Sequence, residues 1–222
     1  MIFYDYWRSS SAWRVRIALN LKQISVERRA VHLARQGDGG GEQFSAEFRA
    51  LNPFSEVPVL VVDDPGGTRR VLAQSMAILG YLEDRFPTPP LFPAEPWLRA
   101  RARQLAEMVN AGMQPFQNLS LLNHLRERGI AEPKEIAHHF NLRGLGALEV
   151  LAGETAGTFL VGDAPTVADV YLIPQLYGAR RFGVDVTAFP TLLRVEGACA
   201  ALPAFAAARP EAQPDAPPPS KG

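Results

Sequence analysis

The chain has 222 residues, and its 23 Lys and Arg balance 23 Asp and Glu, so it has no net charge. Without a basic block, the sequence argues against non-specific binding to nucleic acid or anionic membranes and favours a small ligand. Its start lacks a basic leader followed by an apolar core, and no stretch approaches the roughly 18 apolar residues of a membrane span. The single cysteine, Cys199, forms no intramolecular disulfide. We therefore expect a cytoplasmic protein in which Cys199 is a small core residue.

The first third of the chain alternates between strand and helix patterns. β-favouring runs predict strands near 2–6, 25–32, 59–62 and 70–73. Helical periodicity predicts helices near 11–22, 44–50 and 74–86, with a Gly-rich turn at 37–41. The order βαβ followed by ββα predicts a small four-stranded mixed sheet with helices over residues 1–86.

A proline-rich stretch at 87–96 predicts a linker, after which the sequence changes character. Residues 97–209 are rich in Ala and Leu with helical periodicity, which predicts a helix bundle. Its helices are expected near 97–111, 115–128, 133–152, 166–180 and 191–201. Residues 210–222 are rich in proline and polar side chains, so we expect a disordered or loosely attached tail.

Three consecutive serines, Ser9, Ser10 and Ser11, stand where the first strand gives way to the first helix. Free backbone N–H groups and the positive end of a helix dipole point at whatever binds there. The junction therefore predicts a site for an anion or a thiolate, although each serine alone is also explained as a helix cap.

Two further motifs stand at the start of predicted elements. Gln74 and Ser75 open a helix, where an amide, a hydroxyl and free N–H groups suit a carboxylate, whereas Ser75 alone is most simply an N-cap. Val57 and Pro58 precede a strand. A cis bond there would present the Val57 backbone to a peptide-like ligand, but the local sequence favours an ordinary trans proline, because only about 5–6% of X–Pro bonds are cis.

Other polar motifs are interpreted as structural. Thr166 and Asp169 have the spacing of a capping box. The four histidines (His32, His124, His138 and His139) lack metal-ligand spacing, and the glycine run lacks the context of a nucleotide-binding loop. We therefore expect no metal.

The combined motifs resemble the zeta class of glutathione transferases over nearly the whole chain. The matching stretches are 8–19, 50–53, 57–58, 74–75, 114–119, 161–163, 166–169 and 180–185. The resemblance implies an α/β thioredoxin-like domain followed by an all-α domain, and a homodimer. The class commonly has Ser-Ser-Cys at the first helix, whereas Ser11 stands at the cysteine position here, so chemistry peculiar to that thiol is absent.

The resemblance also implies glutathione as the ligand and a role for individual residues. Ser9, with Ser10 next, would activate the sulfur, and Ser11 completes the cluster. Val57 and Pro58 would hold the cysteinyl backbone, Gln74 and Ser75 the γ-glutamyl end, and Gln43 the glycyl side. Further contacts would come from one helical face that carries Gln114, Asn118 and Ser120. Arg8 and Arg181 would bind substrate carboxylates; alternatively, Arg8 is solvated and Arg181 pairs with Asp185 at the (i, i+4) spacing of a continuing helix.

The reaction implied is the glutathione-dependent cis–trans isomerisation of maleylacetoacetate to fumarylacetoacetate in tyrosine and phenylalanine catabolism. Thiolate attack on the cis double bond, rotation and elimination would achieve it. Three alternatives stay open: maleylpyruvate isomerisation, a general transferase or haloacid dehalogenase activity, and a non-catalytic interaction module. The run 114–122 contains no arginine, which favours maleylacetoacetate.

Overall fold

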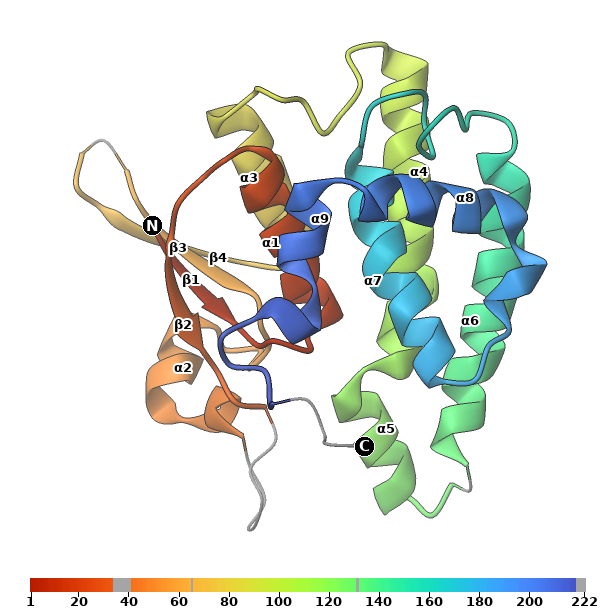
Figure 1. The fold of residues 1–222 in the computed structure, drawn as a ribbon. Helices are drawn as coiled ribbons and strands as arrows, with labels where there is room; N and C mark the ends of the chain where they lie inside the picture. Colours follow the sequence, from red (N-terminus) through yellow and green to blue (C-terminus); the bar gives the residue numbers. More distant parts are fainter. Residues whose placement is uncertain (34–40, 65, 131, 219–222) are drawn as a thin grey trace. The chain divides into compact units, whose positions relative to one another are not determined.

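The computed structural model describes residues 1–33, 41–64, 66–130 and 132–218, so residues 37–40 of the expected Gly-rich turn lie outside the described residues. The chain divides into two compact units. Unit 1 comprises Met1–Pro89 together with the segment that starts at Pro203, and unit 2 comprises Pro90–Leu202 (Figure 1). Within the described residues, no helix is long and apolar enough to cross a membrane.

Unit 1 contains the predicted mixed sheet, with strand order β2-β1-β3-β4. β1 runs parallel to β2 and antiparallel to β3, and β3 is antiparallel to β4. The elements are β1 (Ile2–Asp5), α1 (Ser10–Leu21), β2 (Glu27–Ala30), α2 (Ala46–Leu51), β3 (Val59–Asp63), β4 (Arg69–Ala73), α3 (Ser75–Arg85) and α9 (Pro203–Ala208), with short 3-10 turns η1 (Glu42–Phe44) and η4 (Pro210–Ala212). The βαβ and ββα order expected from the sequence is confirmed.

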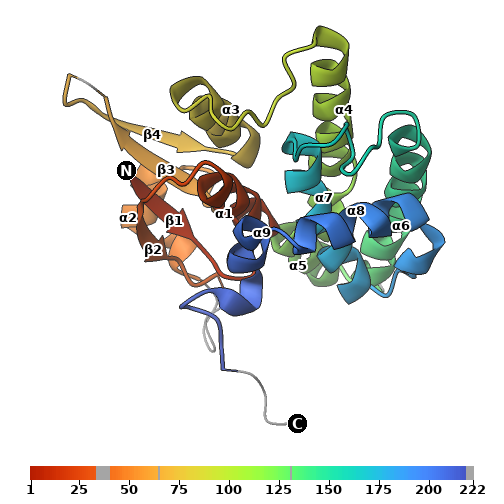
Figure 2. The ribbon, with the colours of Figure 1, turned by 45° about the horizontal axis from the view of Figure 1, so that its top comes forward.

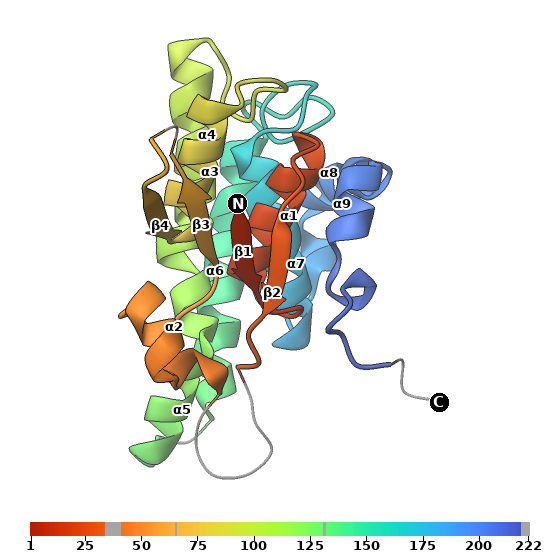
Figure 3. The same ribbon diagram turned by 90° about the vertical axis from the view of Figure 1, so that its left-hand side faces the viewer.

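The alternation of side chains along the two central strands, β1 and β3, buries residues on both faces of this sheet. Tyr4, Val59 and Val61 point to the face on which Phe48 of α2 packs, and the rings of Tyr4 and Phe48 meet edge to face with centroids 6.0 Å apart. Phe3 and Leu60, one position along, are fully buried on the opposite face. Figure 3 shows α1 behind β1 and β2 and α2 below β3 and β4.

Unit 2 is the predicted helix bundle. It consists of α4 (Pro96–Gly112), α5 (Leu119–Glu127), α6 (Pro133–Ala152), α7 (Val167–Arg181) and α8 (Pro190–Ala200), with turns η2 (Gln114–Gln117) and η3 (Val186–Ala188) (Figure 2). α7 is buried almost all round and packs against α4, α6 and α8, as expected of a central helix. The capping box of Thr166 and Asp169 at its start is confirmed.

The end of the chain differs from the sequence-based division. α9 packs on α1, and the described residues that follow it, as far as Pro218, belong to unit 1, whereas the sequence placed 203–209 with the bundle and 210–222 in a loose tail. Pro210 and Gln213 are buried. The difference arises because polar side chains of the segment bond to unit 1, an interaction that composition does not indicate.

Lys22 ties the end of α1 to the end of α3. Its buried Nζ lies 2.7 Å from Glu83 Oε2 and also donates to the carbonyls of Phe86 at 2.7 Å and Pro89 at 2.8 Å. All three ammonium hydrogens are therefore used, which is the condition for burying the charge without a large penalty.

We predict that Lys22→Met lowers the free energy of unfolding by about 3–5 kcal/mol, because it removes one partner of a buried ion pair. Urea denaturation measures the effect. The matched control is Lys134→Met, since Lys134 is exposed in the first turn of α6. Equal losses in the two variants would contradict the assignment.

Candidate active site

Ser9 is the N-cap of α1. Its backbone is extended (φ −67°, ψ 118°), and its Oγ accepts the Ala12 N–H at 3.2 Å. This bond uses the hydroxyl as an acceptor and leaves its hydrogen available as a donor. Capping and anion stabilisation are therefore compatible at this one residue.

The rest of the serine cluster forms the first turn of α1. Ser10 and Ser11 are its first two residues, and all three serines are half-buried. Backbone N–H groups at this point have no partner within the helix. The first turn contains no acidic side chain, so nothing within the helix offsets its positive end.

Arg14 joins this helix start to that of α3, a contact that the sequence reasoning missed. The side chain is 1% exposed, and Nη1 donates to Ser75 Oγ at 3.2 Å. One signal could have indicated it: residues 12–19 of α1 are buried on every side, so an arginine among them must find a polar partner inside the protein.

The expectation that Ser75 is an N-cap is wrong. Gln74 is the N-cap, with no side-chain capping bond, and Ser75 is the first residue of α3 and is 3% exposed. Gln74 has φ 70° and ψ 119°, a left-handed conformation that is strained for a residue with a Cβ. Strain of this kind clusters at binding and catalytic sites, where the fold keeps it for a purpose.

The expectation of a trans Val57–Pro58 bond is also wrong, because the bond is cis. It directly precedes β3, as the sequence indicated. The Val57 side chain is buried in an apolar cluster with Tyr4, Phe48 and Val59. Contacts distant in sequence thus hold this turn, and local composition does not specify them.

Gln43 lies buried in η1. Its Nε2 donates to the Leu33 carbonyl at 3.3 Å, while its Oε1 is buried without a hydrogen-bond partner among the residues that the structure describes. A Cβ at Gly41 would overlap both Gln43 Oε1 and the Leu33 carbonyl oxygen, so only glycine fits there. An oriented acceptor with no partner is a reasonable contact for a ligand N–H.

In unit 2, the three predicted contact residues do not share one helical face. Gln114 begins η2, Ser120 lies in α5, and Asn118 between them is extended (φ −67°, ψ 139°). The expected helix over 115–128 therefore starts at Leu119. Asn118 breaks the periodicity because it serves as the N-cap of α5.

A buried amide network fixes this segment within unit 2. Asn141 of α6 donates to Gln117 Oε1 at 3.0 Å, and Gln175 of α7 bonds both to Asn141 and to Gln117. Asn141 and Gln175 are fully buried. Because Gln117 ends η2, the network holds the backbone between Gln114 and Asn118.

The two candidate substrate arginines belong to different units. Arg8 is half-buried, with its guanidinium 5.6 Å from the centroid of the Trp7 ring. Arg181 is exposed and is the last residue of α7, so the helix does not continue to Asp185, which instead caps η3 by accepting from Thr187 at 3.0 Å. The helical (i, i+4) alternative for Arg181 therefore fails.

The protein's own thiol is not part of the site. Cys199 is fully buried in α8, and burial, with Asp169 and Glu196 nearby, raises the pKa of the thiol far above its ordinary value. Its core role is confirmed. In the described parts of the chain, no group of three or more His, Cys, Asp or Glu is placed to hold a metal ion.

Comparisons with known proteins identify the family. Residues 8–85 match the glutathione S-transferase N-terminal domain, and residues 122–203 match the glutathione S-transferase C-terminal domain. The maleylacetoacetate isomerase of Pseudomonas aeruginosa is 44% identical, over 98% of this chain and 99% of its own length.

Solved structures agree with this result. A maleylacetoacetate isomerase from Anaeromyxobacter dehalogenans, with glutathione bound in its active site, is 55% identical with a TM-score of 0.88, covering 97% of each chain. A zeta-class maleylpyruvate isomerase is 40% identical with a TM-score of 0.89, covering 98% of this chain and all of the other.

We predict that Ser9→Ala lowers the free energy of unfolding by about 1 kcal/mol, the usual cost of losing a serine N-cap. Ser45→Ala is the matched control, because Ser45 caps α2 in the same way, by accepting the Phe48 N–H at 3.2 Å. Urea denaturation should give similar losses. A loss confined to Ser45→Ala would show that the Ser9 hydroxyl is not engaged as a cap.

Proposed function

Because this chain belongs to the glutathione S-transferase family, in the zeta class with the maleylacetoacetate isomerases, we propose that it is a glutathione-dependent cis–trans isomerase of maleylacetoacetate. The product would be fumarylacetoacetate, in tyrosine and phenylalanine catabolism. The observation that carries the proposal is the start of α1, where Ser9 keeps a hydroxyl hydrogen to donate and no acidic side chain offsets the helix dipole.

The residues of unit 1 fit glutathione, a peptide with two carboxylates and a thiol. The buried Gln43 Oε1 offers an acceptor, and the Ser75 hydroxyl and Gln74 stand at a helix start that suits the γ-glutamyl carboxylate. We assign the Val57–Pro58 turn to its cysteinyl backbone and the serine cluster to its sulfur. Gln114, Asn118 and Ser120 would add contacts from unit 2.

Glutathione supplies the thiol that adds to the cis double bond. The chain's part is to keep that sulfur ionised, since a free thiol with a pKa of about 8.5 is mostly protonated at neutral pH. The Ser9 hydroxyl and the N–H groups of the first turn of α1 stabilise a negative sulfur, with Ser10 as the second donor. Arg8 and Arg181 orient the substrate carboxylates and stabilise negative charge that develops on the keto acid.

We place the protein in the cytoplasm and propose that it forms a homodimer. The support for a dimer is a set of large apolar side chains exposed in each unit: Phe54 at 70% and Val71 at 39% in unit 1, and Trp97 at 55% in unit 2. Contiguous apolar patches are typical of interfaces, and these side chains are the candidates to form one. Light scattering measures the assembly state.

The decisive assay compares maleylacetoacetate, maleylpyruvate and a haloacid, each with glutathione, by kcat/KM. We expect maleylacetoacetate to be turned over best. A higher kcat/KM for maleylpyruvate would identify the protein as a maleylpyruvate isomerase. If no substrate is turned over and the protein is not retained on immobilised glutathione, the non-catalytic interaction module is the remaining interpretation.

Ser9→Ala tests the thiol-activating role. Loss of a hydrogen bond to a charged group costs about 1.5–3 kcal/mol, so we expect kcat to fall by roughly 10- to 100-fold with little change in glutathione affinity. Ser45→Ala controls for the lost helix cap and should keep its kcat. If Ser9→Ala keeps its kcat, Ser9 does not activate the thiol, and Ser10→Ala then tests whether Ser10 does.

Arg181→Ala tests the substrate-anchoring role. Loss of a carboxylate contact should raise the KM for the keto acid by about tenfold, or about 1.4 kcal/mol, while KM for glutathione stays unchanged. Arg180→Ala is the control, since Arg180 precedes Arg181 in α7 and pairs with both carboxylate oxygens of Glu196 at 2.6 Å. An equal KM in the two variants would exclude Arg181 as an anchor.

A further inference from the structure

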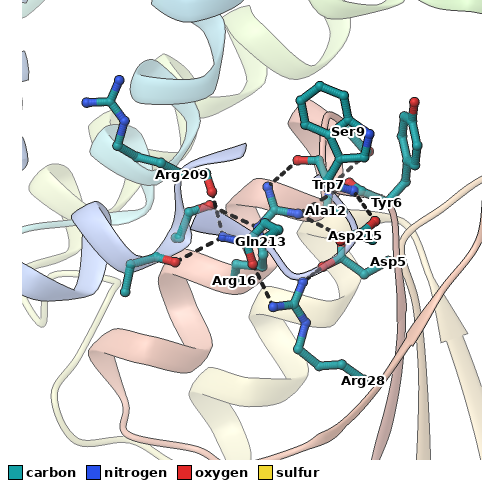
Figure 4. Close-up of polar contacts among 12 residues, drawn as sticks. Asp5, Tyr6, Trp7, Ser9, Ala12, Arg16, Arg28, Arg209, Gln213 and Asp215 are labelled. Atoms are coloured by element: carbon teal, nitrogen blue, oxygen red, sulfur yellow. Dashed lines mark hydrogen bonds and ion pairs between the residues drawn. The ribbon is translucent and has the colours of Figure 1, made fainter. Parts of the chain in front are cut away.

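Side chains from elsewhere in unit 1 hold the backbone that leads to Ser9. β1 ends at Asp5 and α1 begins at Ser10, so regular secondary structure does not bond the turn between them. The Trp7 carbonyl accepts from Arg16 Nη2 at 2.9 Å, and the Trp7 N–H donates to Asp215 Oδ2 at 2.9 Å (Figure 4). Both backbone groups of Trp7 therefore depend on side chains, one from α1 and one from the C-terminal segment.

The C-terminal segment that presents Asp215 is itself fixed. The Ala208 carbonyl accepts from Arg16 Nε at 3.0 Å, so the same guanidinium that holds Trp7 also holds the end of α9. Gln213 is 5% exposed; its Oε1 accepts from Arg28 Nη1 at 2.6 Å, and its Nε2 donates to the Ala207 carbonyl at 2.9 Å. Asp215 is thus carried on an anchored segment.

The charges around this contact balance. Asp5 is 2% exposed and lies between two arginines: Arg16 Nη1 is 2.7 Å from its Oδ1, and Arg28 bonds to its Oδ2. Burial lowers the pKa of Arg16, and Asp215 supplies a second carboxylate whose negative charge opposes that effect (Figure 4). A buried charge needs such partners, so the cluster specifies one arrangement of the turn and the segment.

The turn at residues 6–9 links the position of Trp7 to that of Ser9. The Ser9 N–H donates to the Tyr6 carbonyl at 2.9 Å, and the same carbonyl accepts from Arg16 Nη1 at 3.3 Å. Rotation of the peptide that carries the Trp7 N–H would therefore disturb the bond that places Ser9. A shift of about 1 Å at a reacting group can cost about 100-fold in rate.

We propose that Asp215 is a positioning residue for thiol activation: by accepting the Trp7 N–H, it fixes the turn that aims the Ser9 hydroxyl. The proposal rests on the proposed function and extends it to a part of the chain outside both matched domains, 8–85 and 122–203. The C-terminal segment of unit 1 then belongs to the glutathione site.

The test compares Asp215→Ala, Asp215→Asn and the control Glu211→Ala in the full-length protein. Glu211 lies in the same segment with an exposed carboxylate, so its loss changes the net charge equally. The measurements are kcat, KM, and the thiol pKa of bound glutathione from the ultraviolet absorbance of the thiolate.

For Asp215→Ala we expect kcat to fall about tenfold or more, since a charge-assisted bond is lost, with a raised thiol pKa and an unchanged KM for the keto acid. Asp215→Asn should keep most of the activity, because its amide oxygen accepts the same N–H. Glu211→Ala should match the wild type. The proposal is overturned if Asp215→Ala also matches it, or if Asp215→Asn is impaired as much as Asp215→Ala.

Hydrogen exchange separates this proposal from the proposed function. Asp215→Ala should exchange faster over residues 6–9 and Glu211→Ala should not; unchanged exchange overturns the positioning role. If the wild-type protein isomerises no maleyl acid, the proposed function fails, whereas faster exchange in Asp215→Ala still supports the holding contact. If Asp215→Ala does not fold, Gln213→Ala replaces it, and an unchanged kcat there overturns the proposal.

Discussion

The architecture of unit 1 depends on one buried guanidinium, that of Arg16. Burial lowers its pKa from the ordinary value of arginine, and the Asp5 carboxylate 2.7 Å away opposes that effect. An arginine cannot escape burial by losing its proton, so the fold must supply acceptors for it. Asp5 and the carbonyls of Tyr6, Trp7 and Ala208 do so. The end of β1, the start of α1 and the end of α9 are thereby fixed around one charge.

The serine at this fixed junction combines stability with chemistry. A hydroxyl can accept one hydrogen bond and donate another, so the bond by which the Ser9 oxygen caps α1 leaves its hydrogen available as a donor, as the proposed role requires. The Ser75 hydroxyl at the start of α3 is also used as an acceptor, because its oxygen accepts a hydrogen bond from Arg14. Each helix start is thus tied to the protein interior before any ligand arrives, which is the preorganisation that electrostatic stabilisation requires.

Features with a local signal were predictable from the sequence. Helix α6 has the predicted bounds, 133–152, because Pro133 starts it and apolar periodicity continues to Ala152. The order of strands and helices along unit 1 and the capping box at Thr166 were predictable in the same way. The α5 start was misplaced because Asn118 favours a helix cap over a helix interior, and the cis Val57–Pro58 bond was missed because distant residues pack around it.

The C-terminal segment shows why composition was misleading. A proline-rich, polar sequence has little apolar surface to bury, which predicts a loose tail. Gln213 and Asp215 are nevertheless held by hydrogen bonds with Arg28 and Trp7. These partners are far away in sequence, so the contacts leave no local pattern from which they could be predicted. Cys199 is buried and Ser11 is not a cysteine, so the start of α1 has no protein thiol, and the proposed reaction would depend on a bound thiol and on how accurately the backbone places the Ser9 hydroxyl.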